Sequence, residues 1–427
     1  MIFFQALSIG EAVSRLMRED LPARFTAYDG SSAGAKDAPI GFHLRNERGL
    51  RYLVTAPGDL GLTRAYVSGD LDISGVHPGD PYEAIALLKG ETAHRMPSAS
   101  DIVAAVRALN LHNLVPPSPP PQEHLPRWRR AAEGLRHSFQ RDAEAIQHHY
   151  DVSNRFYELV LGPTMAYTCA LYERPEATLE EAQVAKFDLV CRKLALEPGQ
   201  SLLDVGCGWG TMVLHAAREY GVRALGVTLS LEQAQWAKEA IDREGLSDLA
   251  EVRHLDYRDV VETGFDAVSS IGLTEHVGVR HYANYFTHLR HRLKPGGRLL
   301  NHSITRPHNG HQETGAFIDR YVFPDGELIG SGTIISAAQD IGLEVQHAEN
   351  LRGHYALTLA EWSRNLVEHW DECVAEVGEG RARVWGLYLA GSRYGFEHGE
   401  VELHQVLATR EGPQGPAEFP LRPDWTT

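Results

Sequence analysis

The clearest pattern of apolar and polar positions lies between residues 200 and 301, where short apolar runs alternate with longer amphipathic stretches. The runs that we expect to be buried strands are 202–205, 223–228, 250–253, 268–271 and 298–301. The first two are followed by segments with helical spacing, and the fifth follows a Pro-Gly-Gly turn. Strands that alternate with helices form a parallel sheet with helices on both faces. We therefore predict an α/β fold with a doubly wound, Rossmann-like sheet.

The first 90 residues repeat this alternation in shorter pieces. We expect helices at 9–17 and 62–72, the second closed by Gly69, and strands at 25–30 and 51–55. This pattern predicts a smaller N-terminal α/β module over 1–115, and it shows no catalytic constellation. Five prolines stand within 116–121, which is typical of a stiff, extended linker. We place a linker at 116–126 and the catalytic domain at 127–427.

The pattern also changes after the fifth strand of the predicted sheet. Residues 317–330 interrupt the strand–helix alternation, and we interpret them as an insertion that covers the substrate. We expect a last helix carrying both Trp362 and Trp370, and a final strand near 401–407.

The strand at 202–205 leads into a glycine-rich turn, in which Asp204 is followed by Gly206, Gly208 and Gly210. Glycines remove the Cβ atoms that would keep a ligand away from the backbone. The amides of the turn and of the next helix can then face a polar group. A purely structural glycine turn is the alternative interpretation.

The second strand helps to decide which nucleotide such a turn would hold. A dinucleotide site has the spacing G-x-G-x-x-G and an acidic residue at the end of that strand. Here the spacing is D-x-G-x-G-x-G, and Thr228, Leu229 and Ser230 stand where the acid would be. This form resembles motif I of the S-adenosylmethionine (SAM) methyltransferases of class I. Thr228, Ser230 and Gln233 are then the polar candidates for the ribose.

Composition restricts the function further. The chain has 427 residues and a formal net charge of −16, which argues against nucleic acid as the main partner. The four cysteines form no C-x-x-C pair, so neither a metal site nor a disulfide framework is expected, and the cytoplasm is the predicted location. No window offers about 18 uninterrupted apolar residues. Any membrane contact should therefore be peripheral, at the inner face of the cell membrane.

A basic, partly aromatic segment follows the proline-rich stretch. It includes Arg127, Trp128, Arg129 and Arg130. One interpretation is a solvated helix whose apolar side packs on the catalytic domain. The other is a helix that faces lipid headgroups.

An acid–imidazole pair marks the expected active site. Glu275 and His276 stand at the carboxyl end of the fourth strand, and His302 follows the fifth. Ligands of open α/β sheets bind beyond these strand ends, so the side chains are placed for chemistry. The alternative is that Glu275 and His302 only brace the strand ends.

Taken together, these motifs resemble the cyclopropane-fatty-acyl-phospholipid synthases, over about 148–410. The resemblance rests on Tyr150-Asp151-Val152-Ser153-Asn154, Tyr167-Thr168-Cys169-Ala170, the run 203–210, Thr228-Leu229-Ser230, Asp256-Tyr257-Arg258-Asp259, Ile271-Gly272-x-x-Glu275-His276-x-Gly278, Phe323-Pro324-x-Gly326 and His354-Tyr355-x-x-Thr358-Leu359.

The resemblance implies methyl transfer from SAM to a double bond of a phospholipid acyl chain, and a bound bicarbonate ion as the base that removes a proton afterwards. It implies a catalytic set of Cys169, Glu275, His302, the backbone of Ile304, and Tyr355. It implies that the cofactor is bound by Tyr167, Thr168, Asp204, Gly206, Gly208, Gly210, Thr228, Leu229, Ser230, Gln233, Asp256, Tyr257 and Arg258. Methyl transfer would leave a positive charge on the acyl chain. The aromatic rings of Tyr167, Phe317, Tyr321 and Tyr355 would surround this carbocation.

The product and the partners are expectations of the same kind. Within this family, the runs 269–278 and 77–82 are more similar to the enzymes that make a 10-methylene fatty acyl chain than to those that make a cyclopropane. A 10-methylene chain is the precursor of tuberculostearic-type 10-methyl acids. Cyclopropane formation is the alternative. A methyltransferase for a small polar acceptor and a non-catalytic SAM- or lipid-binding module are the competing hypotheses. We further expect a homo-oligomer, and a reductase partner is possible if a methylene product forms.

Overall fold

The computed structural model describes residues 8–16, 23–92, 115–124, 152–310, 314–324 and 326–425. The chain divides into two compact units. Unit 1 comprises Met1–Leu125, Gly315–Val322 and Trp362–Tyr394, and unit 2 comprises Pro126–Thr314, Phe323–Glu361 and Gly395–Thr427. The division falls within helices α15 (Arg352–Glu368) and α17 (Glu379–Glu397), which contribute residues to both units.

Unit 1 contains the predicted N-terminal α/β module. Its sheet has the strand order β2-β1-β3-β4, with β1 and β3 parallel. The elements in this part are α1 (Ile9–Leu16), β1 (Ala23–Ala27), β2 (Ser32–Gly34), β3 (Ile40–Leu44), α2 (Glu47–Thr55), α3 (Asp59–Val67), β4 (Leu71–Ser74) and α4 (Tyr82–Thr92). Phe25, Phe42, Leu44, Leu50 and Leu71 form the centre of its core.

The strand predicted at 51–55 is wrong, because these residues belong to helix α2. The branched and aromatic residues there favour a strand by propensity. However, Asn46 begins a helix, since its side chain accepts a hydrogen bond from the amide of Gly49 at 3.0 Å. Helical spacing then buries Leu50 and Tyr52 against the sheet. Capping and burial decide the local structure here.

The helix predicted at 62–72 is shorter than expected at its C-terminal end. Helix α3 ends at Val67, and Gly69 has a φ of +71°. The amide of Asp70 returns to the carbonyl oxygen of Ala65 at 2.8 Å, which closes the helix. Gly69 is therefore the predicted stop, but Leu71 and Asp72 form strand β4.

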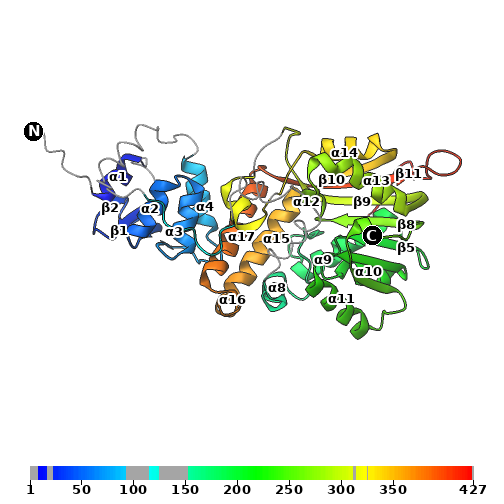
Figure 1. Ribbon diagram of the computed structural model, residues 1–427, viewed down its shortest axis with the longest axis horizontal. Helices are drawn as coiled ribbons and strands as arrows, with labels where there is room; N and C mark the ends of the chain where they lie inside the picture. Colours follow the sequence, from blue (N-terminus) through cyan, green and yellow to red (C-terminus); the bar gives the residue numbers. More distant parts are fainter. Residues whose placement is uncertain are drawn as a thin grey trace, which may run out of the picture. The chain divides into compact units, whose positions relative to one another are not determined.

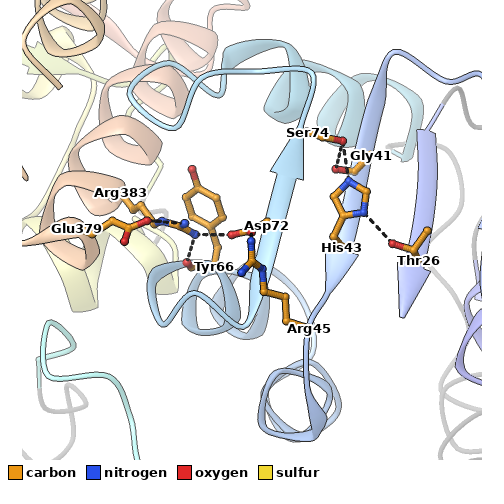
Figure 2. A network of polar contacts seen from close by, with 9 residues as sticks. All are labelled: Thr26, Gly41, His43, Arg45, Tyr66, Asp72, Ser74, Glu379 and Arg383. Atoms are coloured by element: carbon orange, nitrogen blue, oxygen red, sulfur yellow. Dashed lines mark hydrogen bonds and ion pairs between the residues drawn. The ribbon is translucent and has the colours of Figure 1, made fainter. Parts of the chain in front are cut away.

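Unit 1 also includes residues that the sequence assigns to the catalytic domain at 127–427. The single helix predicted to carry both tryptophans is wrong: Trp362 lies in α15 and Trp370 begins α16 (Trp370–Val377). In helix α17, Nη1 of Arg383 lies 3.0 Å from both the carbonyl oxygen of Tyr66 and Oδ1 of Asp72 (Figure 2). These charge-assisted bonds connect α17 with α3 and β4.

The proline-rich stretch at 116–121 belongs to unit 1 as well. The hydroxyl of Tyr52 donates to the carbonyl oxygen of Ser118 at 2.6 Å. Just beyond it, Glu123 accepts two hydrogen bonds from Arg64 and one from Arg320, each at 2.6 Å. The Glu123 side chain is 1% exposed, so this stretch is anchored on the module that it follows.

Unit 2 is built on a seven-stranded sheet with the order β10-β11-β9-β8-β5-β6-β7. The strands are β5 (Ser201–Val205), β6 (Arg223–Thr228), β7 (Ala250–His254), β8 (Phe265–Ile271), β9 (Leu293–Thr305), β10 (Leu343–Asn350) and β11 (Glu402–Arg410). Strands β5 to β9 are parallel, whereas β10 and β11 run antiparallel to their neighbours. Strand β11 contains most of the final strand predicted near 401–407. The predicted α/β class is confirmed.

Helices cover both faces of this sheet. The helical segments between Asn154 and Asp340 are α8 (Asn154–Leu161), α9 (Leu179–Leu194), α10 (Thr211–Tyr220), α11 (Leu231–Glu244), η1 (Tyr257–Asp259), α12 (Thr274–Val277), η2 (Val279–His281), α13 (Tyr282–Arg292), η3 (Ile318–Val322) and α14 (Ser331–Asp340). Helices α13 and α14 cover one face, and α9 to α11 cover the other (Figure 1). Alternate residues of β5 supply the two cores: Leu202 packs with α9 to α11, and Leu203 and Val205 pack with α13 and α14.

Some predictions lie outside the described residues, namely the basic segment with Arg127, Trp128, Arg129 and Arg130, and the motif residues Tyr150 and Asp151. The predicted insertion at 317–330 begins with a π-helical turn, η3 (Ile318–Val322). Its role as a substrate cover stays a prediction.

Candidate active site

The glycine turn after β5 has one open side. Gly206, Gly208 and Gly210 all have positive φ, at +73°, +55° and +79°. A Cβ on Gly206 or Gly210 would meet Leu273 or Ala237, but one on Gly208 would meet no atom of the described residues within 4 Å. Gly208 therefore presents bare backbone to an open space, which fits the approach of a cofactor.

Helix α8 braces this turn from outside the sheet. The indole nitrogen of Trp209 donates to Oδ1 of Asn154 at 2.9 Å, and its ring lies 4.7 Å from that of Tyr157. Ser153 begins α8 by accepting a hydrogen bond from the amide of Phe156 at 3.1 Å. The Ser153-Asn154 motif thus has a structural role next to the glycine turn.

The polar residues after β6 bond mainly with one another. The hydroxyl of Thr228 donates to Oε1 of Gln233 at 2.8 Å, and Ser230 caps α11 by accepting from the amide of Gln233 at 3.2 Å. The carbonyl oxygen of Leu229 lies 3.1 Å from Nε2 of His254. This network fixes the backbone of the turn, so its direct use on a ribose stays a prediction.

In the motif after β7, Asp256 and Arg258 bond to each other. Asp256 is buried and accepts hydrogen bonds from the amide, Nε and Nη2 of Arg258, all within 2.8 Å. The ring of Tyr257 packs edge-on against Tyr285, with the ring centres 5.5 Å apart. Asp256 therefore orders the loop, while Tyr257 and Arg258 are partly accessible for a ligand.

Asp204 lies buried at the end of β5. Its Oδ1 accepts a hydrogen bond from the hydroxyl of Ser269 at 2.6 Å. Burial raises the pKa of Asp204 to about 7, although the Ser269 bond and the charge of Lys186 oppose the rise. Asp204 therefore supports the glycine turn from within the protein. Its raised pKa lies near neutral pH, so its carboxyl group can gain or lose a proton there.

Helix α9 contributes buried polar residues that the sequence analysis missed. Nζ of Lys186 lies 3.0 Å from Oγ1 of Thr168, and Nε2 of Gln183 lies 2.9 Å from the carbonyl oxygen of Thr168. Burial lowers the pKa of Lys186 to about 7, although the neighbouring Cys169 and Asp204 oppose this shift. Gln183 and Lys186 stand where helical spacing demands apolar residues, and this irregularity is the signal that would have identified them.

Glu275 is held at its predicted place beyond β8, at the start of α12. Its Oε2 accepts a hydrogen bond from the hydroxyl of Ser303 at 2.9 Å, and its Oε1 lies 3.5 Å from the amide nitrogen of Ile304. Burial raises the pKa of Glu275, although the hydrogen bonds oppose the rise. Glu275 and Ile304 are thus brought together as predicted, with Ser303 as a further partner.

His302 is 1% exposed in β9. Its Nδ1 lies 3.2 Å from Nε2 of Gln405 in β11, whereas its Nε2 has no hydrogen-bond partner among the described residues. Burial, followed by the charges of Lys186 and Lys193, lowers the pKa of His302 well below its ordinary value. The ring is therefore neutral, with one nitrogen available to a ligand.

Cys169 and Tyr355 are brought close through the start of α15. Sγ of Cys169 lies 3.8 Å from the carbonyl oxygen of Leu351, and the amide of Ala170 donates to Oγ1 of Thr358 at 3.0 Å. Tyr355 is buried in the same turns, and its ring lies 4.5 Å from that of Phe396. Burial raises the pKa of Cys169, so its sulfur is a neutral thiol.

Strand β11 connects the start of α15, where Cys169 and Tyr355 lie, with His302 in β9. The amide of Leu351 donates to the carbonyl oxygen of Leu403 at 2.8 Å, and Gln405, two residues further along, contacts His302. The buried acid and imidazole at the carboxyl ends of β8 and β9 suit proton transfer and the binding of a small anion.

The described residues contain no cluster of three or more His, Cys, Asp or Glu side chains that could hold a metal ion. No described helix has the length and apolarity to span a membrane.

Comparison with known proteins gives a consistent result. The sequence profile of the family described as "Mycolic acid cyclopropane synthetase" matches residues 137–406. A "probable fatty acid methyltransferase" of Mycobacterium tuberculosis is 60% identical over 405 residues, which cover 95% of each chain. A "tuberculostearic acid methyltransferase" of the same organism is 32% identical, covering 94% of this chain and 91% of its own.

Solved structures agree with these relatives. A crystal structure of a "mycolic acid cyclopropane synthase" in complex with SAH and CTAB superposes with a TM-score of 0.60 at 32% identity. The match covers 63% of this chain and 98% of that one.

Proposed function

The chain belongs to the mycolic acid cyclopropane synthetase family of SAM-dependent fatty acid methyltransferases, and from that premise we propose that it methylates a cis double bond in the acyl chain of an unsaturated phospholipid, such as an oleoyl chain. The observation that supports this best is the burial of Glu275 and His302 beside the cofactor-type glycine turn, with a ring nitrogen of His302 that has no hydrogen-bond partner in the described part of the chain. Methylation of an oxygen or nitrogen acceptor would not require a separate anionic base.

SAM, when bound, supplies an electrophilic methyl group. The alkene is a weak nucleophile, and its attack leaves a positive charge on the acyl chain. The protein must therefore keep water away, stabilise this charge with aromatic rings, and provide a base for one proton. Tyr167 and Tyr355 are the proposed rings in unit 2. Phe317 and Tyr321, which belong to unit 1, are proposed from the sequence alone.

Bicarbonate is the proposed base. The residues fit such an ion, since His302 has a buried nitrogen to which no described residue bonds, and the amide of Ile304 lies at the same strand end. Glu275 would accept the hydrogen of bicarbonate rather than repel its charge, and its raised pKa favours sharing a proton. The neutral thiol of Cys169 and the hydroxyl of Tyr355 complete the proposed set. The ion would leave the site carrying the proton.

The proposed product is a 10-methylene acyl chain, which forms if a hydride shift precedes the loss of the proton. The relative named for tuberculostearic acid supports this choice. Direct ring closure to a cyclopropane is the second candidate, and the family description and the structural neighbour favour it. Peripheral contact with the membrane, a reductase partner and a homo-oligomeric state stay predictions.

The test is incubation of the purified chain with SAM and dioleoyl phospholipid vesicles, followed by NMR of the released fatty esters. Vinylidene protons identify the methylene product and high-field ring protons identify the cyclopropane, whereas mass cannot separate them because both gain one CH₂. Binding of SAM without any lipid product would contradict the proposal and favour a non-catalytic module. Methylation of soluble acceptors alone would favour the small-molecule alternative.

A further inference from the structure

A chain of contacting side chains leads from His302 in β9, past β11, to the edge strand β10 of the sheet. Gln405 faces His302 in the register of β9 and β11, and its Oε1 lies 2.7 Å from Nζ of Lys193 in helix α9. Lys193 in turn contacts the carboxylate of Glu349 in β10. Gln405 and the side chain of Lys193 are both fully buried.

The lysine fixes the orientation of the Gln405 amide. Nζ of Lys193 stands between two acceptors, the Glu349 carboxylate and the Gln405 oxygen, so it must donate to both. The oxygen of Gln405 therefore faces the lysine, and its NH₂ group faces His302. The reverse orientation would point the NH₂ group of Gln405 at the ammonium of Lys193, and two groups that can only donate would then face each other.

The amide orientation then fixes the proton on the imidazole. The NH₂ group of Gln405 can only donate, so Nδ1 of His302, at 3.2 Å, must accept. A neutral imidazole carries one proton, and that proton must be on Nε2. This is the nitrogen without a partner among the described residues, and a buried N–H without an acceptor is costly.

We infer that Lys193 and Gln405 are positioning residues that hold His302 as its Nε2-protonated tautomer, so that Nε2–H donates a hydrogen bond to a small oxyanion. The inference rests on the proposed function, in which bicarbonate is that ion. The other tautomer would present a lone pair to the anion and repel it. The chain from Glu349 to His302 thus selects an anion rather than a cation at this nitrogen.

The first test measures the tautomer of His302 in the parent protein. NMR of protein labelled with nitrogen-15 in its histidines distinguishes a protonated ring nitrogen from a bare one, and the spectrum of His302→Gln identifies the signals of His302. We expect Nε2 to be protonated and Nδ1 to be bare at neutral pH. A proton on Nδ1 would overturn the inference.

The second test reverses the tautomer. Gln405→Glu keeps the side-chain length but replaces the donor with a second acceptor, so Nδ1 should gain the proton. Gln346→Glu is the matched control, because it makes the same change in β10, where the amide donates to Oγ1 of Thr409 at 3.0 Å. The control should leave the signals of His302 unchanged. A bare Nδ1 in Gln405→Glu would overturn the inference.

Activity provides an independent measurement. If Nε2 becomes bare in Gln405→Glu, the bicarbonate concentration for half-maximal turnover should rise about tenfold or more, with unchanged affinity for SAM. An unchanged concentration, despite a bare Nε2, would overturn the donor role. If turnover of the parent does not respond to bicarbonate while the tautomer is as inferred, the proposed base fails and the positioning role of Lys193 and Gln405 stands.

Discussion

Ser303 donates its hydroxyl hydrogen to Oε2 of Glu275 across 2.9 Å, and so joins the acid beyond β8 to the residue next to His302 in β9. This bond orients the carboxylate and leaves Oε1 beside the amide nitrogen of Ile304, at 3.5 Å. The acid is therefore held by residues of the strand that carries the imidazole. We therefore expect Glu275 and His302 to act together in the reaction.

Glu275→Gln should lower turnover about 100-fold or more, the scale of losing a positioned acid–base group. The amide keeps the size of the side chain but presents a donor where the carboxylate accepts, so the base would be misoriented. Affinity for SAM, measured by calorimetry, should stay unchanged. Glu344→Gln, an exposed change in β10, is the matched control. Near-normal turnover in Glu275→Gln would remove the bicarbonate assignment.

His302→Ala should lower turnover by a similar factor. The double variant with Glu275→Gln should be far less than additive, because both residues are proposed to hold one ion. Steady-state kinetics of the four proteins measure this coupling directly. Fully multiplicative losses would indicate that the two residues act independently.

Gly208→Val should abolish binding of SAM, because the valine side chain would fill the open space at this position. The same change also strains a backbone with φ of +55°. Gly245→Val separates the two effects, since Gly245 has a φ of +69° and equally open surroundings at the end of α11. Both variants should lose similar stability, and only Gly208→Val should lose SAM. Equal SAM affinity in both would remove this turn from the cofactor site.

Asp204→Asn should change how stability depends on pH. The pKa of Asp204 is raised from 3.8 to about 7 in the folded protein. Its contribution to stability is therefore fully present below pH 3.8 and is lost as the pH rises through about 7. The stability of the variant relative to the parent should increase over this window, as measured by denaturant unfolding. Asp340→Asn, an exposed change in α14, is the control for the chemical change itself. A stability difference between Asp204→Asn and the parent that does not change with pH would contradict the raised pKa of Asp204.

Glu123→Gln should destabilise unit 1 by about 3 kcal/mol, since it leaves Arg64 and Arg320 facing a neutral side chain in a buried cluster. Burial opposes ionisation, but the bonds from these arginines hold the pKa of Glu123 below its ordinary value. The stabilisation should therefore be present near neutral pH and be lost as the pH falls through that lowered pKa. Glu379→Gln, with a side chain 60% exposed, is the control and should cost less than about 1 kcal/mol. Similar losses for both would contradict the buried cluster.

Neutralising Arg127, Arg129 and Arg130 together should weaken binding to anionic vesicles by about 1 kcal/mol per charge at low salt. Sedimentation with vesicles of increasing phosphatidylglycerol content measures the effect. The triple change of the exposed residues Arg24, Arg223 and Arg243 to Gln removes the same charge elsewhere. Equal vesicle binding by the basic-segment variant and the parent would favour the packed-helix interpretation.

Much of unit 2 followed from local patterns. Strands β5, β6 and β8 contain short apolar runs next to turn residues, and the glycines after β5 mark a backbone that only glycine adopts easily. Such signals depend on neighbours in the chain. In the N-terminal module the same reasoning failed at 51–55, because capping by Asn46 outweighed the strand preference of the residues that follow it.

The sequence by itself determined the fold class, the family and the motif residues, because periodic burial and close spacing leave local traces. The tertiary structure alone decided which side chains meet. Gln405 lies 103 positions from His302, and Glu349 lies 156 positions from Lys193. These pairs form because β11 returns antiparallel to β9 and because α9 covers the same face of the sheet. Hydrogen bonding across that face, rather than any spacing along the chain, orients the imidazole of the candidate site.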